Sequence, residues 1–342
     1  MQAYWPASRD VITQADVDAA VEQVTREPGA ECLRVVVFGD AELAPEGERS
    51  LRPLTAGPQY AATGRPGVEI TAIVPLPGAE VQVVALDAGT RLVRTHEDGA
   101  EVRRLVHVAA PGRDGSTFEQ TLAALRGLEA ALAQAGMAPG HLDRTWYFLA
   151  DIEETYGELN KARDATFDRW KLTTYPASTG IGAGLPPGQA VAVMAEAVAR
   201  DGEAAASPFG TDLQCAPYDY GPRFVRANRS RRNGCQVVHV SGISSIDKHG
   251  VSLPQHDVRA AVDYAMASFT DLLAGAGLSL ADLVSCYVYC KDAEARSAFE
   301  AHCADAGLTV PHLSNTVDVC RPELRFEIEG RAVRRDAWRE QE

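Results

Sequence analysis

The sequence is poor in long apolar runs and has no leader-like start. No window approaches the run of about 20 apolar residues that a membrane helix needs. The first ten residues, MQAYWPASRD, have neither the basic region nor the apolar core of a signal peptide. We therefore expect a cytoplasmic protein with no membrane partner.

Closely spaced cysteines are also lacking. The chain has 7 cysteines, an odd number, and only Cys286 and Cys290 lie close together. Their spacing is not the CxxC of zinc sites, and the 8 histidines are scattered along the chain. We expect reduced thiols in a reducing compartment, and no metal site.

Positive charge is scarce. Lys and Arg number 33 against 47 Asp and Glu, which gives a net charge of −14. Such a field repels nucleic acids, so we expect no nucleic-acid partner. A content of 46% hydrophobic and 23% charged residues is typical of a folded globular protein, and 342 residues suffice for two domains.

What is present is an internal repeat. The segment ALAQAGMAPGHLDRTWYFLAD (131–151) aligns without a gap with LLAGAGLSLADLVSCYVYCKD (272–292). Upstream of each lies a strand-like run, RLVHVAA (104–110) and QVVHVSG (236–242), followed by apolar residues at helical spacing. The order strand, helix, strand therefore occurs twice in the chain.

The repeat continues downstream. The segment AVAVMAEAVARD (190–201) resembles LRFEIEGRAVRRD (324–336), and the alignment pairs Glu196 with Glu329 and Met194 with Glu327. Matches at three places in the same order indicate a duplicated unit. Each unit ends in a second helix and a final strand, which predicts an α+β fold with helices on one sheet face.

The chain is divided by a change in composition. Further β-like runs, separated by Gly- and Pro-rich turns, precede the first helix, so we expect a β-rich N-terminal extension. The segment DGEAAASPFG (201–210) is rich in Ala, Gly and Ser and is the best candidate for a linker. We therefore divide the chain into residues 1–205, with the extension and the first unit, and residues 206–342, with the second unit.

The end of the second unit resembles the end of the RidA (YjgF) family. Its sequence PHLSNT (311–316) is followed by FEIEG (326–330), and the first unit has its own version, YPASTGIG (175–182). The resemblance implies two tandem RidA/YjgF-like units with the chorismate-mutase-like α+β topology. RidA relatives are trimers with sites between subunits, so the oligomeric state stays open between a monomer and a RidA-like trimer.

A tandem of such units behind a β-rich extension resembles the chorismatase family. The matching segments are YPASTGIGAG (175–184), GPRFVRA (221–227), VSGISSID (240–247) and VDVCRPELRFEIE (317–329). The resemblance implies an enzyme that cleaves chorismate to pyruvate and a hydroxylated ring acid, without a cofactor.

Glu327 is the candidate catalytic residue. In a strand of period two, Phe326 and Ile328 face one way and Glu327 and Glu329 the other. The resemblance assigns to Glu327 the acid that protonates the enolpyruvyl methylene carbon, a step that needs a carboxyl group with a raised pKa. The alternative is two solvent-facing carboxylates on an edge strand.

Arginines are concentrated in one segment, GPRFVRANRSRRNG (221–234), which holds five of them. Chorismate is a dianion, and the planar guanidinium group binds a carboxylate through two hydrogen bonds. We favour Arg226 as a substrate contact and keep Arg223 in reserve. The alternative, a solvated hairpin tip, best describes the other three arginines.

A second arginine candidate lies on a predicted helix. Arg163 shares one face with Tyr156, Asn160 and Phe167, and a buried arginine needs an anionic partner. A chorismate carboxylate and a structural salt bridge remain equal alternatives for that partner. Tyr220, just before the arginine-rich segment, either donates a hydrogen bond to the substrate or caps the linker.

Cys320 lies seven residues before Glu327. It has no CxxC partner and no evident histidine dyad, so a nucleophilic role is disfavoured. A cysteine near the acid resembles the chorismatases that release 3-hydroxybenzoate, which implies a pocket-shaping residue. A dihydroxycyclohexadiene carboxylate and 4-hydroxybenzoate remain the alternative products.

The glycine-rich segment 175–184 allows a close approach of ligand to backbone. We include Thr179 from it, and Gly242 from segment 240–247, among the substrate-binding candidates. In RidA-type imine deaminases an arginine of this turn binds the substrate carboxylate, whereas here the matching residues are Ser178 and His312. Imine deamination is therefore disfavoured; it and non-catalytic binding of a small ligand remain alternatives.

Overall fold

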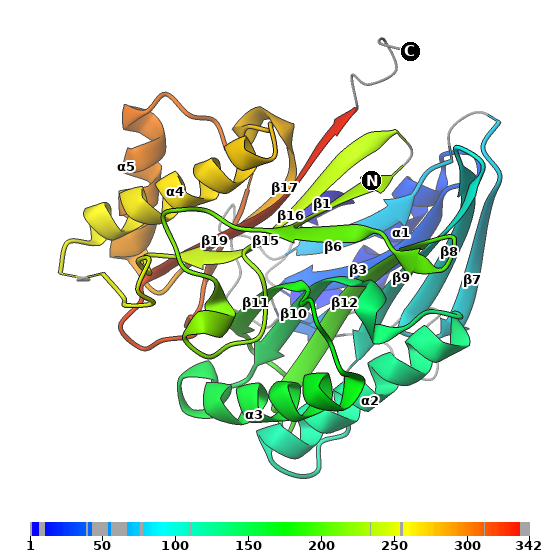
Figure 1. The fold of residues 1–342 in the computed structure, drawn as a ribbon, viewed down its shortest axis with the longest axis horizontal. Helices are drawn as coiled ribbons and strands as arrows, with labels where there is room; N and C mark the ends of the chain where they lie inside the picture. Colours follow the sequence, from blue (N-terminus) through cyan, green and yellow to red (C-terminus); the bar gives the residue numbers. More distant parts are fainter. Residues whose placement is uncertain are drawn as a thin grey trace.

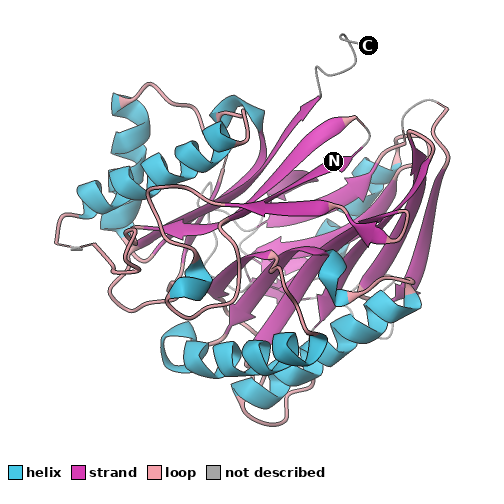
Figure 2. Cartoon of the chain, viewed as in Figure 1, coloured by secondary structure: helices cyan, strands magenta, loops and turns pink. Residues whose placement is uncertain are grey.

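The computed structural model describes residues 2–6, 11–38, 40–42, 54–55, 67–75, 78–109, 111–232, 234–253, 256–310 and 312–335. Two α+β units account for most of them, with a smaller N-terminal sheet beside them (Figure 1). Helices lie on the outer sides and the sheets lie between them (Figure 2). No described helix is long and apolar enough to cross a membrane.

The first unit is a sheet covered by two helices. The N-terminus of helix α2 (Thr117–Gln134) is capped by a capping box, in which the side chains of Ser116 and Glu119 each accept a hydrogen bond from the other's backbone N–H group. The N-terminus of helix α3 (Ile152–Trp170) is capped by the side chain of Asp151. In spatial order the strands are β11 (Ala177–Gly182), β10 (Leu142–Leu149), β12 (Val191–Arg200), β9 (Ala100–Ala109), β8 (Thr90–Glu97) and β7 (Val81–Asp87), with α2 and α3 on one face; β13 (Glu203–Ala204) pairs with β12.

The second unit repeats this arrangement, and its strands are given below from the opposite edge of the sheet. The side chains of Asp257 and Asp292 cap the N-termini of its helices α4 (Val258–Gly275) and α5 (Ala293–Asp305). The strands are β14 (Ala206–Phe209), β15 (Ala227–Arg232), β16 (Cys235–Ser244), β19 (Phe326–Arg335), β17 (Leu283–Cys290) and β18 (Leu313–Thr316), with α4 and α5 on one face. The expected tandem α+β fold is confirmed.

The sequence alignment of the final strands is wrong by two residues. Trp146 and Tyr287 are equivalent in the gapless part of the repeat; Trp146 pairs across the ladder with Met194, whereas Tyr287 pairs with Glu329. The residue that matches Glu327 is therefore Ala192, not Met194. A slip of two residues keeps every side chain on its face, so the alternating pattern contained no signal against it.

The N-terminal extension supplies a third sheet. It contains β1 (Gln2–Pro6), β6 (Gly67–Ile73), β3 (Glu31–Phe38) and β5 (Leu54–Thr55), with helix α1 (Gln14–Thr25) and a separate pair, β2 (Val11–Thr13) and β4 (Asp40–Glu42). Val36 of β3 packs in one core cluster with Trp146 and Tyr287, one residue from each unit. Strands β7 and β8, which we expected within the extension, belong to the sheet of the first unit.

The helix-free faces of the two large sheets pack against each other. Trp146 and Phe148 of β10 share a core cluster with Tyr287 and Tyr289 of β17. Phe326 and Ile328 belong instead to the core under α4 and α5, so Glu327 and Glu329 lie on the inter-sheet face. The prediction that both carboxylates face away from Phe326 and Ile328 is confirmed. The alternative of solvent-facing carboxylates is wrong, because the two residues are only 4% and 2% exposed.

The division at residue 205 falls between strands of different sheets. Strand β13 pairs with β12 in the first unit, and β14 pairs with β15 in the second. The two-domain division itself stays a prediction, because the two units share one buried core cluster between their sheets.

Candidate active site

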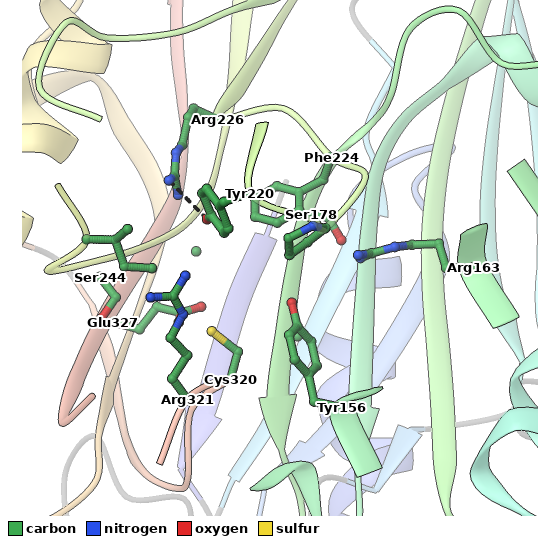
Figure 3. Close-up of a pocket in the computed structure, with 14 residues that line it drawn as sticks. Tyr156, Arg163, Ser178, Tyr220, Phe224, Arg226, Ser244, Cys320, Arg321 and Glu327 are labelled. Atoms are coloured by element: carbon green, nitrogen blue, oxygen red, sulfur yellow. Dashed lines mark hydrogen bonds between the residues drawn. The ribbon is translucent and has the colours of Figure 1, made fainter. Parts of the chain in front are cut away.

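A cavity of about 220 Å³ lies between the two units (Figure 3). The first unit contributes residues of α3 and β11, and the second unit contributes residues of β16, β19 and three loops. The lining residues are Tyr156, Arg163, Ser178, Gly180, Tyr220, Pro222, Phe224, Arg226, Gly242, Ser244, Ile246, Cys320, Arg321 and Glu327.

Glu327 is the single carboxyl group among the described residues that line this cavity. Its side chain has no hydrogen bond or ion pair with any described residue. Burial, reinforced by the nearby Glu329 carboxylate, raises the pKa of Glu327 to about 8, although Arg226 and Arg144 act in the opposite sense. Near neutral pH the group therefore carries a proton that it can transfer.

Gly242 makes room for this carboxyl group. The register between β16 and β19 shifts between Val240 and Ile243, so Gly242 lies in a β-bulge. A Cβ atom at position 242 would lie 1.8 Å from Oε1 of Glu327. Glycine is required here because of close approach rather than because of an unusual backbone angle.

Arg226 presents an unneutralised charge from the second unit. It is 3% exposed; its Nε donates to the Cys215 carbonyl at 3.2 Å and its Nη2 to the Tyr220 hydroxyl at 3.1 Å. Both acceptors are neutral. Arg321 is similar, because it donates to Ser252 Oγ at 2.9 Å and to the Gly250 carbonyl at 3.0 Å.

Arg163 faces the cavity from the first unit (Figure 3). Its Nη2 donates to Asn160 Oδ1 at 2.6 Å, and its guanidinium group lies over the rings of Tyr147 and Phe224. A structural salt bridge, one of the two alternatives for its partner, is not found among the described residues. Each of the three cavity arginines thus lacks a carboxylate partner in that part of the chain, which is the arrangement of an anion-binding site.

Cys320 forms part of the cavity wall. Burial, with the Glu327 carboxyl group as the next cause, raises the pKa of its thiol to about 12. The thiol is therefore protonated at neutral pH and is a poor nucleophile.

The structure brings together six of the eight predicted site residues: Glu327, Arg163, Arg226, Tyr220, Cys320 and Gly242. Arg223 lies outside the cavity, where it pairs with Asp168 and lies 3.5 Å from Asp164. Thr179 points away from the cavity-lining Ser178 and donates to Glu329.

Several lining residues were missed as ligand contacts. Arg321 follows Cys320 directly, but nothing in the sequence distinguishes it from an exposed turn arginine. Tyr156 was recognised as part of a buried helix face; burial raises the pKa of its phenol. Phe224 and Ser244 carried no polar or periodic signal of their own.

The close approach at Gly242 generates a first prediction. Gly242→Ala should displace the Glu327 carboxyl group, because a methyl group would occupy its place. A crystal structure of the variant should show Glu327 in another rotamer. Gly127→Ala, where a Cβ would meet nothing within 4 Å, is the matched control. An unmoved Glu327 in Gly242→Ala would contradict the steric argument.

Comparison with known proteins shows which solved structures resemble this fold. No protein-family model and no curated protein matches the sequence. Two small solved structures match part of the chain: the YjgF gene product of E. coli, at 25% identity over 38% of this chain and 99% of that chain with a TM-score of 0.30, and yeast Mmf1, at 20% identity over 37% and 98% with a TM-score of 0.31.

A further solved structure matches the chain over nearly its whole length. It is a crystal structure described as a chorismatase, with a TM-score of 0.69 and 19% identity, covering 97% of this chain and 98% of that chain. The chain therefore has the fold of a solved chorismatase over almost its whole length.

Proposed function

We propose that this protein is a chorismatase that cleaves the enolpyruvyl ether of chorismate to pyruvate and 3-hydroxybenzoate. The observation that carries the proposal is a set of three arginines, without carboxylate partners in the described part of the chain, around one carboxyl group of raised pKa. A substrate with two carboxylates and an acid-labile enol ether matches both features. The shared fold with a solved chorismatase supports it.

The reaction begins with proton transfer. Glu327 donates its proton to the methylene carbon of the enolpyruvyl group, which leaves an oxocarbenium ion on the neighbouring carbon. Arg163, Arg226 and Arg321 hold the substrate carboxylates. Cleavage of the ether then releases pyruvate.

The product depends on whether the adjacent ring hydroxyl or a water molecule reacts next. When water is excluded, the adjacent ring hydroxyl attacks the ring carbon that bears the ether; that C–O bond breaks, and pyruvate leaves with the ether oxygen as its carbonyl. The epoxide so formed opens at its other carbon, and loss of the proton from the carbon that keeps the oxygen gives 3-hydroxybenzoate. No water is consumed overall. When water attacks, the product is a dihydroxycyclohexadiene carboxylate and one water is consumed. The Cys320 side chain occupies part of the cavity wall and excludes that water.

Loss of the acid tests the central step. Glu327→Gln keeps size but has no transferable proton, so turnover should fall by about 10²–10⁴ while chorismate still binds. Pyruvate release measured with lactate dehydrogenase gives turnover, and calorimetry gives binding. Wild-type protein that yields neither pyruvate nor an aromatic acid would rule out the proposed activity and leave ligand binding as the function.

Loss of an arginine tests the anion site. Arg226→Ala should weaken chorismate binding by about 2–5 kcal/mol, because it removes the partner of a desolvated carboxylate. Arg231→Ala is the control, since Arg231 is exposed and lies outside the cavity. Equal small losses in both variants would argue that the cavity does not bind the dianion.

Cys320→Ala tests the product. A smaller side chain admits water, so the product should shift from 3-hydroxybenzoate towards the dihydroxycyclohexadiene carboxylate, while total pyruvate falls less than the aromatic yield. Chromatography of the acids after complete consumption of chorismate measures the ratio. An unchanged ratio would mean that Cys320 does not control access of water.

A further inference from the structure

A second carboxylate lies behind the candidate acid. Glu329 follows Glu327 by two residues on the same face of β19 and is 2% exposed. Unlike Glu327, it is saturated with donors. Its Oε1 accepts from Trp146 Nε1 at 2.9 Å and from the Tyr289 hydroxyl at 3.1 Å, and its Oε2 accepts from Arg144 Nη2 and Thr179 Oγ1.

Most of these donors belong to the other unit. Arg144 and Trp146 lie on β10 and Thr179 on β11, all in the first unit, whereas Tyr289 lies on β17 of the second. Arg144 is 2% exposed in its side chain and forms its ion pair with Glu329. The first unit therefore determines the surroundings of one carboxylate on the strand that bears Glu327.

The surroundings of the two carboxyl groups stabilise different protonation states. Four donors, one of them a guanidinium group, stabilise the negative charge of Glu329. Glu327 has no such donor, and a neighbouring negative charge disfavours its ionisation. Environments that differ in this way assign the proton to one carboxyl group of a pair.

We propose that Glu329, held by Arg144, Thr179 and Trp146 of the first unit, is a positioning residue that keeps the proton on Glu327. The use of that proton rests on the proposed function, whereas the arrangement of charges does not. The proposal also gives Thr179 a role away from the substrate, as a donor to this carboxylate.

Other charged groups line the cavity with Glu327, and of these Arg226 lowers the pKa of Glu327. Arg226 and Arg321 come from loops of the second unit, and Arg163 comes from α3. From behind, Arg144 opposes protonation, but its charge is compensated by Glu329. Removing Glu329 therefore favours ionisation of Glu327 in two ways, because it deletes a negative charge and leaves the Arg144 charge uncompensated. The titratable cavity groups that are neutral are Tyr156, Tyr220 and Cys320.

The test is a direct titration of the Glu327 carboxyl group. In Glu329→Gln its midpoint should fall from about 8 by about one pH unit or more. Carbon-13 NMR of protein labelled at glutamate side chains follows the group, and the signal absent from Glu327→Gln identifies it. Chorismate turnover, which needs the protonated form, should be lost at correspondingly lower pH.

Two further variants separate electrostatics from damage to the fold. Glu196→Gln alters another buried carboxylate, paired with Arg34 and Arg331, and should leave the Glu327 midpoint unchanged. The double variant Arg144→Met/Glu329→Gln removes both charges and should return the midpoint towards that of the wild type; if Glu329→Gln alone does not fold, a single Arg144→Met should raise the midpoint.

Each outcome separates this inference from the proposed function. A wild-type midpoint in Glu329→Gln overturns the positioning role, even if chorismate is cleaved. If the single variant does not fold, an unchanged or lowered midpoint in Arg144→Met overturns it instead. A lowered midpoint in a protein that does not cleave chorismate overturns the activity and supports the charge arrangement.

Discussion

The packing of two sheets through faces that carry charged as well as apolar side chains is the constraint on which the molecule depends. Charged side chains between sheets need partners of opposite charge, since an unpaired buried charge is strongly destabilising. The partners come from different parts of the chain: Arg144 of β10 pairs with Glu329 of β19, and Arg331 of β19 pairs with Glu196 of β12. Arg34 of β3 also pairs with Glu196, which ties the N-terminal sheet to the same network.

The candidate active site lies where this compensation stops. Between the same two units, Arg163, Arg226 and Arg321 line a cavity without carboxylate partners among the described residues, and Glu327 lacks a donor. Buried charges without partners cost stability, and the paired network beside the cavity offsets that cost. This contrast between unpaired cavity residues and paired neighbours is the reason why we propose the cavity as the binding site.

The sequence predicted the parts of this arrangement that depend on periodicity and order. The repeat, the α+β fold and the placement of Glu327 opposite Phe326 and Ile328 follow from patterns of apolar residues; the arginine-rich segment indicated Arg226, and the resemblance indicated Cys320. Contacts across the sheet were not predictable in the same way. Whether Thr179 faces a ligand or Glu329 depends on the register of β11, and Arg321 reaches the cavity only because the loop 245–253 supplies acceptors for it.

Duplication explains how one cavity acquired unlike walls. At the positions of Glu327 and Glu329 the first unit has Ala192 and Met194, so the carboxyl pair occurs once. At the turn where RidA-type deaminases have an arginine, Ser178 lines the cavity, whereas its counterpart His312 packs edge-on against Phe299. A cation at Ser178 would be a fourth positive charge in a cavity that already holds three. In the proposed function the three arginines of α3 and of the second unit's loops bind the anion, so Ser178 of β11 contributes only backbone and a small hydroxyl group to the cavity.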